Sequence, residues 1–153
     1  VDEVGVTTWY ADCDGDGFAS MGARMLDSCS MPAVGLSMCT TGGGWTSRSP
    51  AMAGNRDCND GNASVNPAQT AFQTTAISGA PAASDFDYDC NGTEEQRVST
   101  IGSCTRTGGS CRLVEGWQTT SAVCGATGTW ITSCTSSLLT CTTGTEMRQQ
   151  ACR

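Results

Sequence analysis

The sequence predicts a small, disulfide-rich, loop-rich fold with little helix that is held by a bound cation, followed by short β-strands in Cys-rich tandem repeats. Two observations predict this class. The chain has 11 cysteines among 153 residues, and only 38% of its residues are hydrophobic and 6% aromatic. A chain with so little apolar material cannot bury a large core, and disulfides and bound metal are the usual substitutes for one.

The cysteine content also predicts where the chain works. Cytosolic thiols are kept reduced, so a chain this rich in cysteine is expected to be secreted and to act outside the cell or at the cell surface. The sequence starts at Val1 and contains no apolar run of membrane-spanning length. We therefore expect a mature product whose signal peptide has been removed, and no membrane span.

Two missing residue types restrict the chemistry. The chain contains no His, which removes the usual general base, the Ser–His and Cys–His pairs and the commonest zinc ligand. It also contains no Lys, which excludes Lys Schiff bases and Lys–Asn cross-links. A catalyst would depend on carboxylates alone, so we expect that the chain is not an enzyme and keep a carboxylate-based hydrolase only as a remote alternative.

Charge divides the chain into two predicted domains. Residues up to Arg97 include thirteen acidic residues and four Arg, a net charge of −9, whereas residues from Val98 include two acidic residues and four Arg, a net charge of +2. The division predicts an acidic metal-binding domain over 1–97 and a Cys-rich repeat region over 98–153. Nucleic acid is not an expected partner, because its phosphates require a basic surface.

The first acidic cluster has the spacing of a cation-binding loop. Asp12, Asp14 and Asp16 alternate with other residues, and the glycines between and after them permit the turns that point three carboxylates inward. This is the start of an EF-hand-type loop, in which the backbone carbonyl of Phe18 supplies the next oxygen. Oxygen ligands in an irregular loop favour calcium over magnesium.

The loop lacks its last ligand, because Ala23 stands at the twelfth position, where an EF-hand carries a bidentate Glu. Other acidic clusters must complete the coordination. The second cluster offers Asp57, Asn59, Asp60 and Asn62 as donors. A second ion is predicted in the third cluster, among Asp85, Asp87, Asp89 and Asn91.

These clusters resemble the MopE-type metal-binding repeat of secreted bacterial surface proteins over roughly residues 8–95, and they are similar to the calcium loops of thrombospondin type 3. The motifs that carry the resemblance are residues 12–18, residues 57–60 with Asn66-Pro67 after them, and residues 87–92. The resemblance implies calcium ligation by Asp12, Asp14, Asp16, Asp57, Asp60, Asp87 and Asp89, with Asn59, Asn62 and Asn91 as further donors. A chain without His gives no reason to expect copper.

An internal repeat occupies the second domain. Ile101-Gly-Ser-Cys104 aligns with Ile131-Thr-Ser-Cys134, which predicts two copies, 98–127 and 128–153, with three cysteines each. Their Thr, Val, Ile and Trp residues favour short strands, with turns at Gly108-Gly109 and over Gly125–Gly128. Elsewhere we expect loops, with one helical turn over 65–72 that is capped by Asn66 and starts at Pro67.

The Cys-rich repeats over 98–153 resemble thrombospondin type 1 modules. The resemblance rests on Trp130-Ile-Thr-Ser-Cys134, Cys141-Thr-Thr-Gly144 and Arg148-Gln-Gln-Ala-Cys152. It implies that an Arg side chain stacks on a Trp face, a cation–π contact.

The cysteine count is odd, so at least one thiol has no partner in the chain if all the others pair. The cysteines are Cys13, Cys29, Cys39, Cys58, Cys90, Cys104, Cys111, Cys124, Cys134, Cys141 and Cys152. The unpaired one is a free thiol, the partner of a segment outside this sequence, or a link between subunits.

Together these features predict an extracellular calcium-binding structural protein that self-associates into a polymer, as the building unit of a surface filament, layer or adhesive stalk. The alternative is a secreted module of a larger surface protein that binds a glycan or another surface protein.

Overall fold

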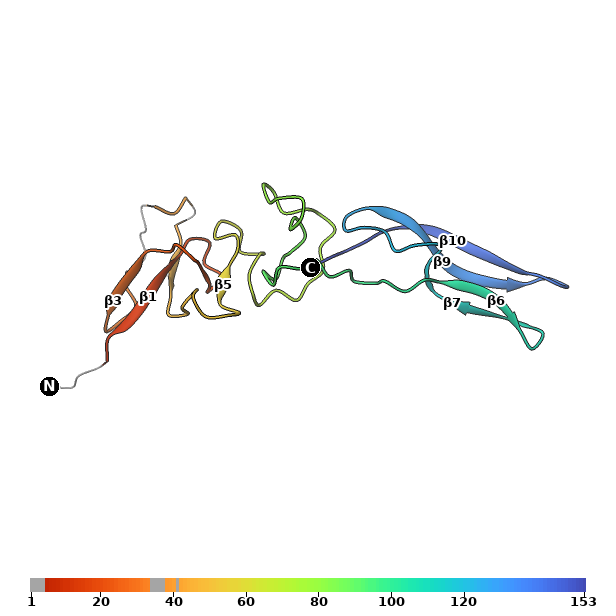
Figure 1. Cartoon of the computed structure of the whole chain (residues 1–153), viewed down its shortest axis with the longest axis horizontal. Coiled ribbons are helices and arrows are strands. Elements are labelled where there is room, and N and C mark those ends of the chain that lie inside the picture. The colour runs from red at the N-terminus through yellow and green to blue at the C-terminus, as the bar shows by residue number, and fades with distance from the viewer. Residues whose placement is uncertain (1–4, 34–37, 41) are drawn as a thin grey trace. The chain divides into compact units, whose positions relative to one another are not determined.

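The computed structural model describes residues 5–33, 38–40 and 42–153, which form ten β-strands and no helix (Figure 1). Five disulfides join ten of the cysteines, and loops connect strands as short as two residues. The predicted disulfide-rich, loop-rich class with little helix is therefore confirmed. None of the described residues belongs to a helix that is long and apolar enough to cross a membrane.

The chain forms two compact units, and neither is continuous in sequence. Unit 1 contains residues 1–70 and 87–93, and unit 2 contains residues 71–86 and 94–153. These bounds differ from the predicted domains 1–97 and 98–153, because two segments before residue 98 pair with the end of the chain. Gln73 and Gln96 both form β-bridges with Cys152.

A three-stranded antiparallel sheet, in the order β3-β1-β4, organises unit 1. Its strands are β1 (Thr7–Asp12), β3 (Met25–Ser28) and β4 (Gly44–Thr46). Ala11 of β1 and Trp45 of β4 form a small core, against which Trp9 and Cys39 pack. Strand β1 ends at Asp12, so the sheet fixes the start of the first acidic loop.

A second, parallel pairing joins β2 (Ala19–Ser20) to β5 (Arg56–Asp57). Ser20 lies opposite Asp57 in this ladder, and Ala19 is completely buried beside it. The pairing places the start of the second acidic cluster next to the end of the first.

Two disulfides belong to unit 1, Cys13–Cys39 and Cys58–Cys90. Cys29 is exposed and is the one free cysteine in the described part of the chain. The odd thiol that the cysteine count predicts is therefore Cys29.

Unit 2 contains the two copies of the repeat, and each copy forms a β-hairpin. The strands are β6 (Ser103–Thr107), β7 (Ser110–Val114), β8 (Gly116–Trp117), β9 (Thr127–Ser136) and β10 (Cys141–Gln149), with β10-β9-β8 as one sheet. Strands β9 and β10 have 10 and 9 residues, longer than predicted, because Thr-rich β-forming sequence runs through both and a bulge at Gly144/Thr145 preserves the pairing. Gly128, predicted in a turn, lies within β9.

The disulfides of unit 2 join equivalent cysteines of the two copies. They are Cys104–Cys134, Cys111–Cys141 and Cys124–Cys152, with sequence separations of 30, 30 and 28. The two hairpins are thus linked copy to copy, and no disulfide lies within one copy.

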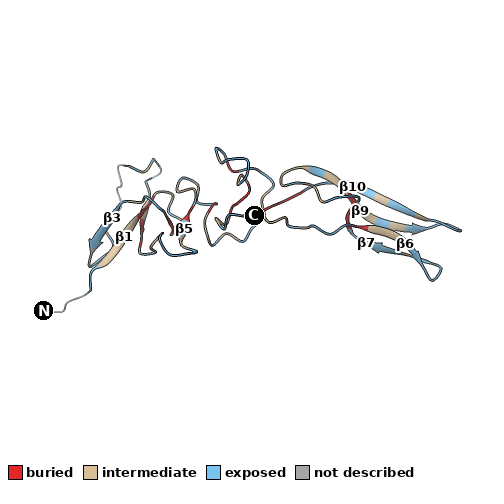
Figure 2. Cartoon of the chain, in the orientation of Figure 1, coloured by how far each residue is buried: buried red, intermediate tan, exposed pale blue. Residues whose placement is uncertain are grey.

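Two tryptophans form the centre of unit 2. Trp117 and Trp130 meet edge to face, with ring centroids 5.2 Å apart, and both side chains are buried. The guanidinium of Arg148 lies 4.5 Å from the centroid of Trp130, which is the Arg-on-Trp contact that the resemblance implies. Figure 2 shows that buried residues occur in short stretches of the chain, as a small core requires.

The helical turn predicted over 65–72 is present only as one hydrogen-bonded turn, and no helix forms there. The backbone N–H of Gln69 donates to the carbonyl of Asn66 in a single turn, and the side chain of Asn66 accepts the N–H of Ala68. The predicted capping bond of Asn66 is therefore present, but no helix follows it.

Candidate metal centre

Asp12 closes the first acidic loop. Its Oδ1 accepts the backbone N–H of Gly15 at 2.7 Å and its Oδ2 accepts that of Gly17 at 2.8 Å. The two glycines have φ angles of +81° and +91°, the left-handed conformation that the sequence predicts for them. The loop is therefore wound around the carboxylate of its first residue.

Asp14 and Asp16 each use one carboxylate oxygen to hold the loop. Asp14 Oδ1 accepts the N–H of Asp16 at 3.3 Å, and Asp16 Oδ1 accepts the N–H of Phe18 at 2.8 Å. These Asx turns orient the side chains and leave the second oxygen of each carboxylate for another partner.

The second cluster is anchored beside this loop. Asp57 is only 2% exposed, and its Oδ1 accepts the N–H of Asn59 at 2.7 Å. Asp60 Oδ1 accepts the N–H of Cys13 at 2.7 Å, and its Oδ2 accepts the hydroxyl of Ser20 at 3.3 Å. Both carboxylates are thus fixed by bonds to backbone or side-chain groups.

Carboxylates of the two clusters converge. Oxygens of Asp12, Asp14 and Asp16 lie within 4.8 Å of one another, and so do oxygens of Asp14, Asp57 and Asp60. Asp14 belongs to both groups and joins them into a five-aspartate centre, the name used below for these five residues. The structure therefore brings the second cluster to the incomplete loop, where the sequence predicts additional donors.

Three oxygens of the centre are buried without a hydrogen-bond partner among the described residues. They are Oδ2 of Asp14, Oδ2 of Asp16 and Oδ2 of Asp57. Burying a carboxylate oxygen with no donor costs several kcal/mol in an ordinary protein interior. A bound cation removes this cost.

The same burial changes the acidity of the centre. Burial, together with a smaller effect of neighbouring carboxylates, raises the pKa of Asp57 to about 7 and that of Asp16 to about 6. The pKa values of Asp14 and Asp60 are also raised, again mainly by burial. Each raised value reflects negative charge that water does not stabilise.

The amides of the second cluster shape the loop through their backbones. The carbonyl of Asn59 accepts the N–H groups of Gly61 and Asn62. Asn62 Oδ1 accepts the N–H of Ser64 at 3.2 Å. Direct ligation by either amide oxygen stays a prediction.

Phe18 directly follows the loop. Its ring is buried and lies 4.5 Å from the guanidinium of Arg48. The role of its carbonyl as a ligand stays a prediction.

The third cluster has a different arrangement. Asp87 uses both carboxylate oxygens on the backbone N–H groups of Asn91 and Gly92, each at 3.0 Å. Asn91 Oδ1 accepts the N–H of Thr93 at 2.8 Å. Within the described ranges, no group of three clustered acidic or cysteine ligands includes Asp85, Asp87 or Asp89. A second ion at this cluster stays a prediction.

Two groups that include cysteines also bring ligand atoms together, but their cysteines form disulfides. One consists of Asp57 with Cys58 and Cys90, and the other of Cys104, Cys134 and Cys141. Disulfide sulfur is not the thiolate that binds metal.

Sequence reasoning missed one residue beside the centre. The hydroxyl of Ser20 donates to Oδ2 of Asp60 at 3.3 Å. Nothing in the sequence distinguishes Ser20 from other serines.

Comparisons with protein-family models, with curated proteins and with solved structures found no match to this chain.

Proposed function

We propose that the chain is an extracellular calcium-binding structural protein and that the five-aspartate centre holds the calcium. The observation that carries the proposal is the set of three buried carboxylate oxygens, from Asp14, Asp16 and Asp57, that accept no hydrogen bond from the described residues. They belong to two segments that approach each other only in the folded chain. A cation between them would satisfy all three at once.

The donor atoms favour calcium over other ions. Zinc prefers nitrogen and thiolate sulfur, but the chain has no His and ten of its 11 cysteines are in disulfides. Magnesium requires near-ideal octahedral geometry, whereas calcium accepts six to eight oxygens in irregular loops. A centre of carboxylates from two segments fits calcium best.

A structural role follows from which segments the ion would join. Calcium would connect the loop at 12–16 with residues 57–60, and an ion that binds only the folded chain stabilises it. Five disulfides add covalent links and fit an oxidising environment outside the cytosol. We propose that this rigid, secreted chain is a unit of a surface filament, layer or adhesive stalk and self-associates into a polymer.

The calcium proposal is tested by isothermal titration of the EDTA-treated chain with calcium and, separately, with magnesium. We expect calcium to bind more tightly, and Asp57→Asn to weaken it at least about tenfold, because a charged ligand is lost. Asp27→Asn is the matched control, since Asp27 is exposed on β3 and, among the described residues, its carboxylate bonds to the hydroxyl of Thr8 alone. The proposal is overturned if the chain does not bind calcium, or if Asp57→Asn and Asp27→Asn lower the calcium affinity equally.

The assembly proposal has a separate test. Electron microscopy and non-reducing gels, with calcium and with EDTA, show whether the chain forms polymers. A monomer under both conditions contradicts the polymer and favours the second candidate function, a secreted binding module. One observation supports that candidate, a cavity in unit 2 that contains Trp and Arg side chains.

A further inference from the structure

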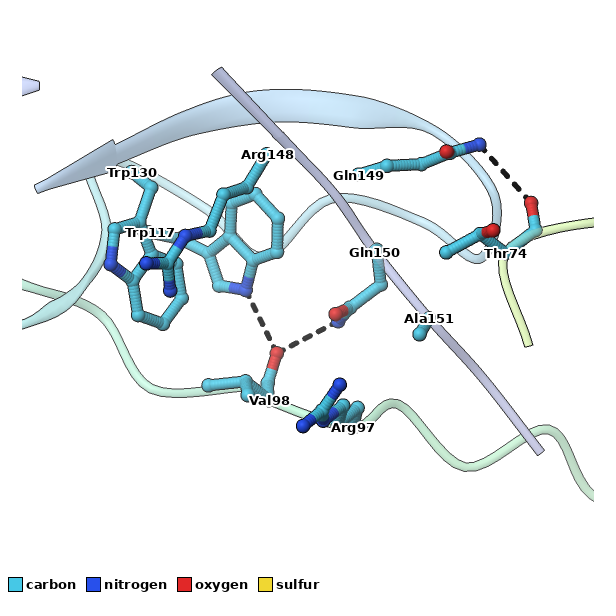
Figure 3. Close-up of a pocket in the computed structure, with 9 residues that line it drawn as sticks. All are labelled: Thr74, Arg97, Val98, Trp117, Trp130, Arg148, Gln149, Gln150 and Ala151. Carbon is cyan, nitrogen blue, oxygen red and sulfur yellow. Dashed lines mark hydrogen bonds between the residues drawn. The ribbon is translucent and has the colours of Figure 1, made fainter. Parts of the chain in front are cut away.

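Unit 2 contains a cavity of about 340 Å³, and its lining combines aromatic, amide and guanidinium groups (Figure 3). The residues that matter are Trp117, Trp130, Val98, Gln150, Arg97 and Arg148. None of them belongs to the five-aspartate centre, and no acidic residue lines the cavity. A volume near 300 Å³ is at the lower end of ligand sites, which suits one monosaccharide-sized group.

The floor of the cavity is fixed by hydrogen bonds. The carbonyl of Val98 accepts the indole N–H of Trp117 at 2.8 Å and the side-chain amide of Gln150 at 2.7 Å, as Figure 3 shows. The neighbouring Gln149 donates to the carbonyls of Thr74 and Gly125. A ligand would therefore meet groups that are already oriented, which lowers the entropy cost of binding.

The guanidiniums of the two arginines differ in the interactions that they already make within the chain. Arg148 lies on the face of Trp130 and gives its Nε–H to Glu146 at 2.6 Å, whereas its terminal nitrogens bond to no described residue. The guanidinium of Arg97 has neither a hydrogen bond nor an ion pair with the described part of the chain. Two guanidiniums and one carboxylate give the site a formal charge of +1, which matches a monoanion better than a phosphate dianion.

We propose that this cavity binds an acidic sugar, a pyranose that carries one carboxylate, as uronic acids do. The carboxylate would bond to the forked N–H groups of Arg97 and Arg148. The C–H groups of the ring would contact Val98 and the small exposed parts of Trp117 and Trp130 that line the cavity, and its hydroxyls would lie near the amides. The proposal is independent of calcium binding and gives the second candidate function a specific ligand class.

Intrinsic tryptophan fluorescence tests the proposal, because Trp117 and Trp130 line the cavity. The full chain is titrated with glucuronate, with glucose and with inorganic phosphate, in the presence of calcium. We expect glucuronate to change the emission and to bind at least about tenfold more tightly than glucose or phosphate. If glucose binds as tightly as glucuronate, the carboxylate of the sugar has no role in recognition and the proposal is overturned. If phosphate binds as tightly as glucuronate or more tightly, the ligand is not an acidic sugar and the proposal is also overturned.

The key variant is Arg97→Gln, because the guanidinium of Arg97 has no hydrogen bond or ion pair with the described residues that the substitution would remove. We expect glucuronate affinity to fall at least about tenfold, as for a lost charged hydrogen bond. Arg112→Gln is the control, since Arg112 is exposed on β7 and does not line the cavity. Unchanged affinity in Arg97→Gln overturns the proposal. Failure of glucuronate to bind, combined with Arg97-dependent dimers in sedimentation, also overturns it and identifies a second copy as the occupant.

Discussion

The carboxylate of Asp60 accepts the backbone N–H of Cys13 at 2.7 Å, although 47 positions separate the two residues in the chain. This bond joins the second acidic cluster to the first loop through protein atoms. A cation that binds at the five-aspartate centre would therefore not have to pay the full entropy of bringing the two segments together.

Removing calcium should destabilise unit 1. At a free calcium concentration one hundred times the dissociation constant, binding adds about 2.7 kcal/mol to the free energy of unfolding. We expect the melting temperature to fall when EDTA replaces calcium, and Asp57→Asn to abolish most of that difference. Identical melting curves in calcium and EDTA would contradict a structural calcium.

Gly17→Ala should weaken both calcium binding and stability. Gly17 has φ of +91° with no atom within 4 Å of a new Cβ, so the cost arises from the backbone and is about 1–2 kcal/mol. Gly61→Ala is the matched control, because Gly61 lies in the second cluster without a positive φ. Chemical denaturation and calcium titration of both variants check the prediction, and equal effects would contradict it.

The calcium-free chain should become less stable as pH rises. The folded-state pKa values of Asp16, about 6, and Asp57, about 7, lie above the ordinary value of 3.8, so the folded state binds protons that the unfolded state has released. Stability therefore falls between about pH 4 and pH 7 and levels off above that range. Denaturant unfolding in EDTA measures this slope.

Calcium affinity should change in the opposite direction over the same range, because protons and calcium compete for the same carboxylates. Titrations at pH 5 and pH 8 should show tighter binding at pH 8. Affinity independent of pH would place calcium elsewhere.

Cys29 should be the one reactive thiol of the native chain. It is exposed, and the other ten cysteines are in disulfides. Mass spectrometry after iodoacetamide treatment should show one modified cysteine per chain, and none in Cys29→Ser. If a Cys29 disulfide links subunits, the oxidised multimers on non-reducing gels should disappear in Cys29→Ser. Multimers that persist in this variant would contradict a Cys29 disulfide between subunits.

Replacing both Cys104 and Cys134 by Ser should destabilise unit 2 by about 2–4 kcal/mol. The disulfide closes a separation of 30 residues and joins the two copies of the repeat. Calcium affinity should stay unchanged, since the five-aspartate centre lies in unit 1. Urea unfolding gives the stability, and a parallel calcium titration is the control.

The sequence predicted the acidic loop because the spacing of its aspartates and glycines is typical of a cation-binding loop. Alternating Asp12, Asp14 and Asp16 with glycines constrain the loop locally, and the missing twelfth ligand indicates that donors come from elsewhere. The pairing that brings Asp57 to the loop could not be predicted, because β2 and β5 have two residues each and carry no periodic pattern.

The repeat indicated which cysteines are equivalent but not how they pair. Equal spacing is compatible with disulfides within each copy or between copies, and only the packing of the two hairpins selects the second. The cavity of unit 2 was also not predictable, because Arg97 lies before the repeats in sequence and reaches Ala151 through a backbone hydrogen bond. Its neighbours come from segments with no shared motif.

The copy-to-copy disulfides also affect how the chain is made. During synthesis Cys104 and Cys111 emerge before their partners, which lie 30 residues further along. An oxidase that acts on the nascent chain would meet these two thiols before their partners and could join them to each other. Reaching the native pairs then requires thiol–disulfide exchange, so efficient production depends on an isomerase and not on an oxidase alone.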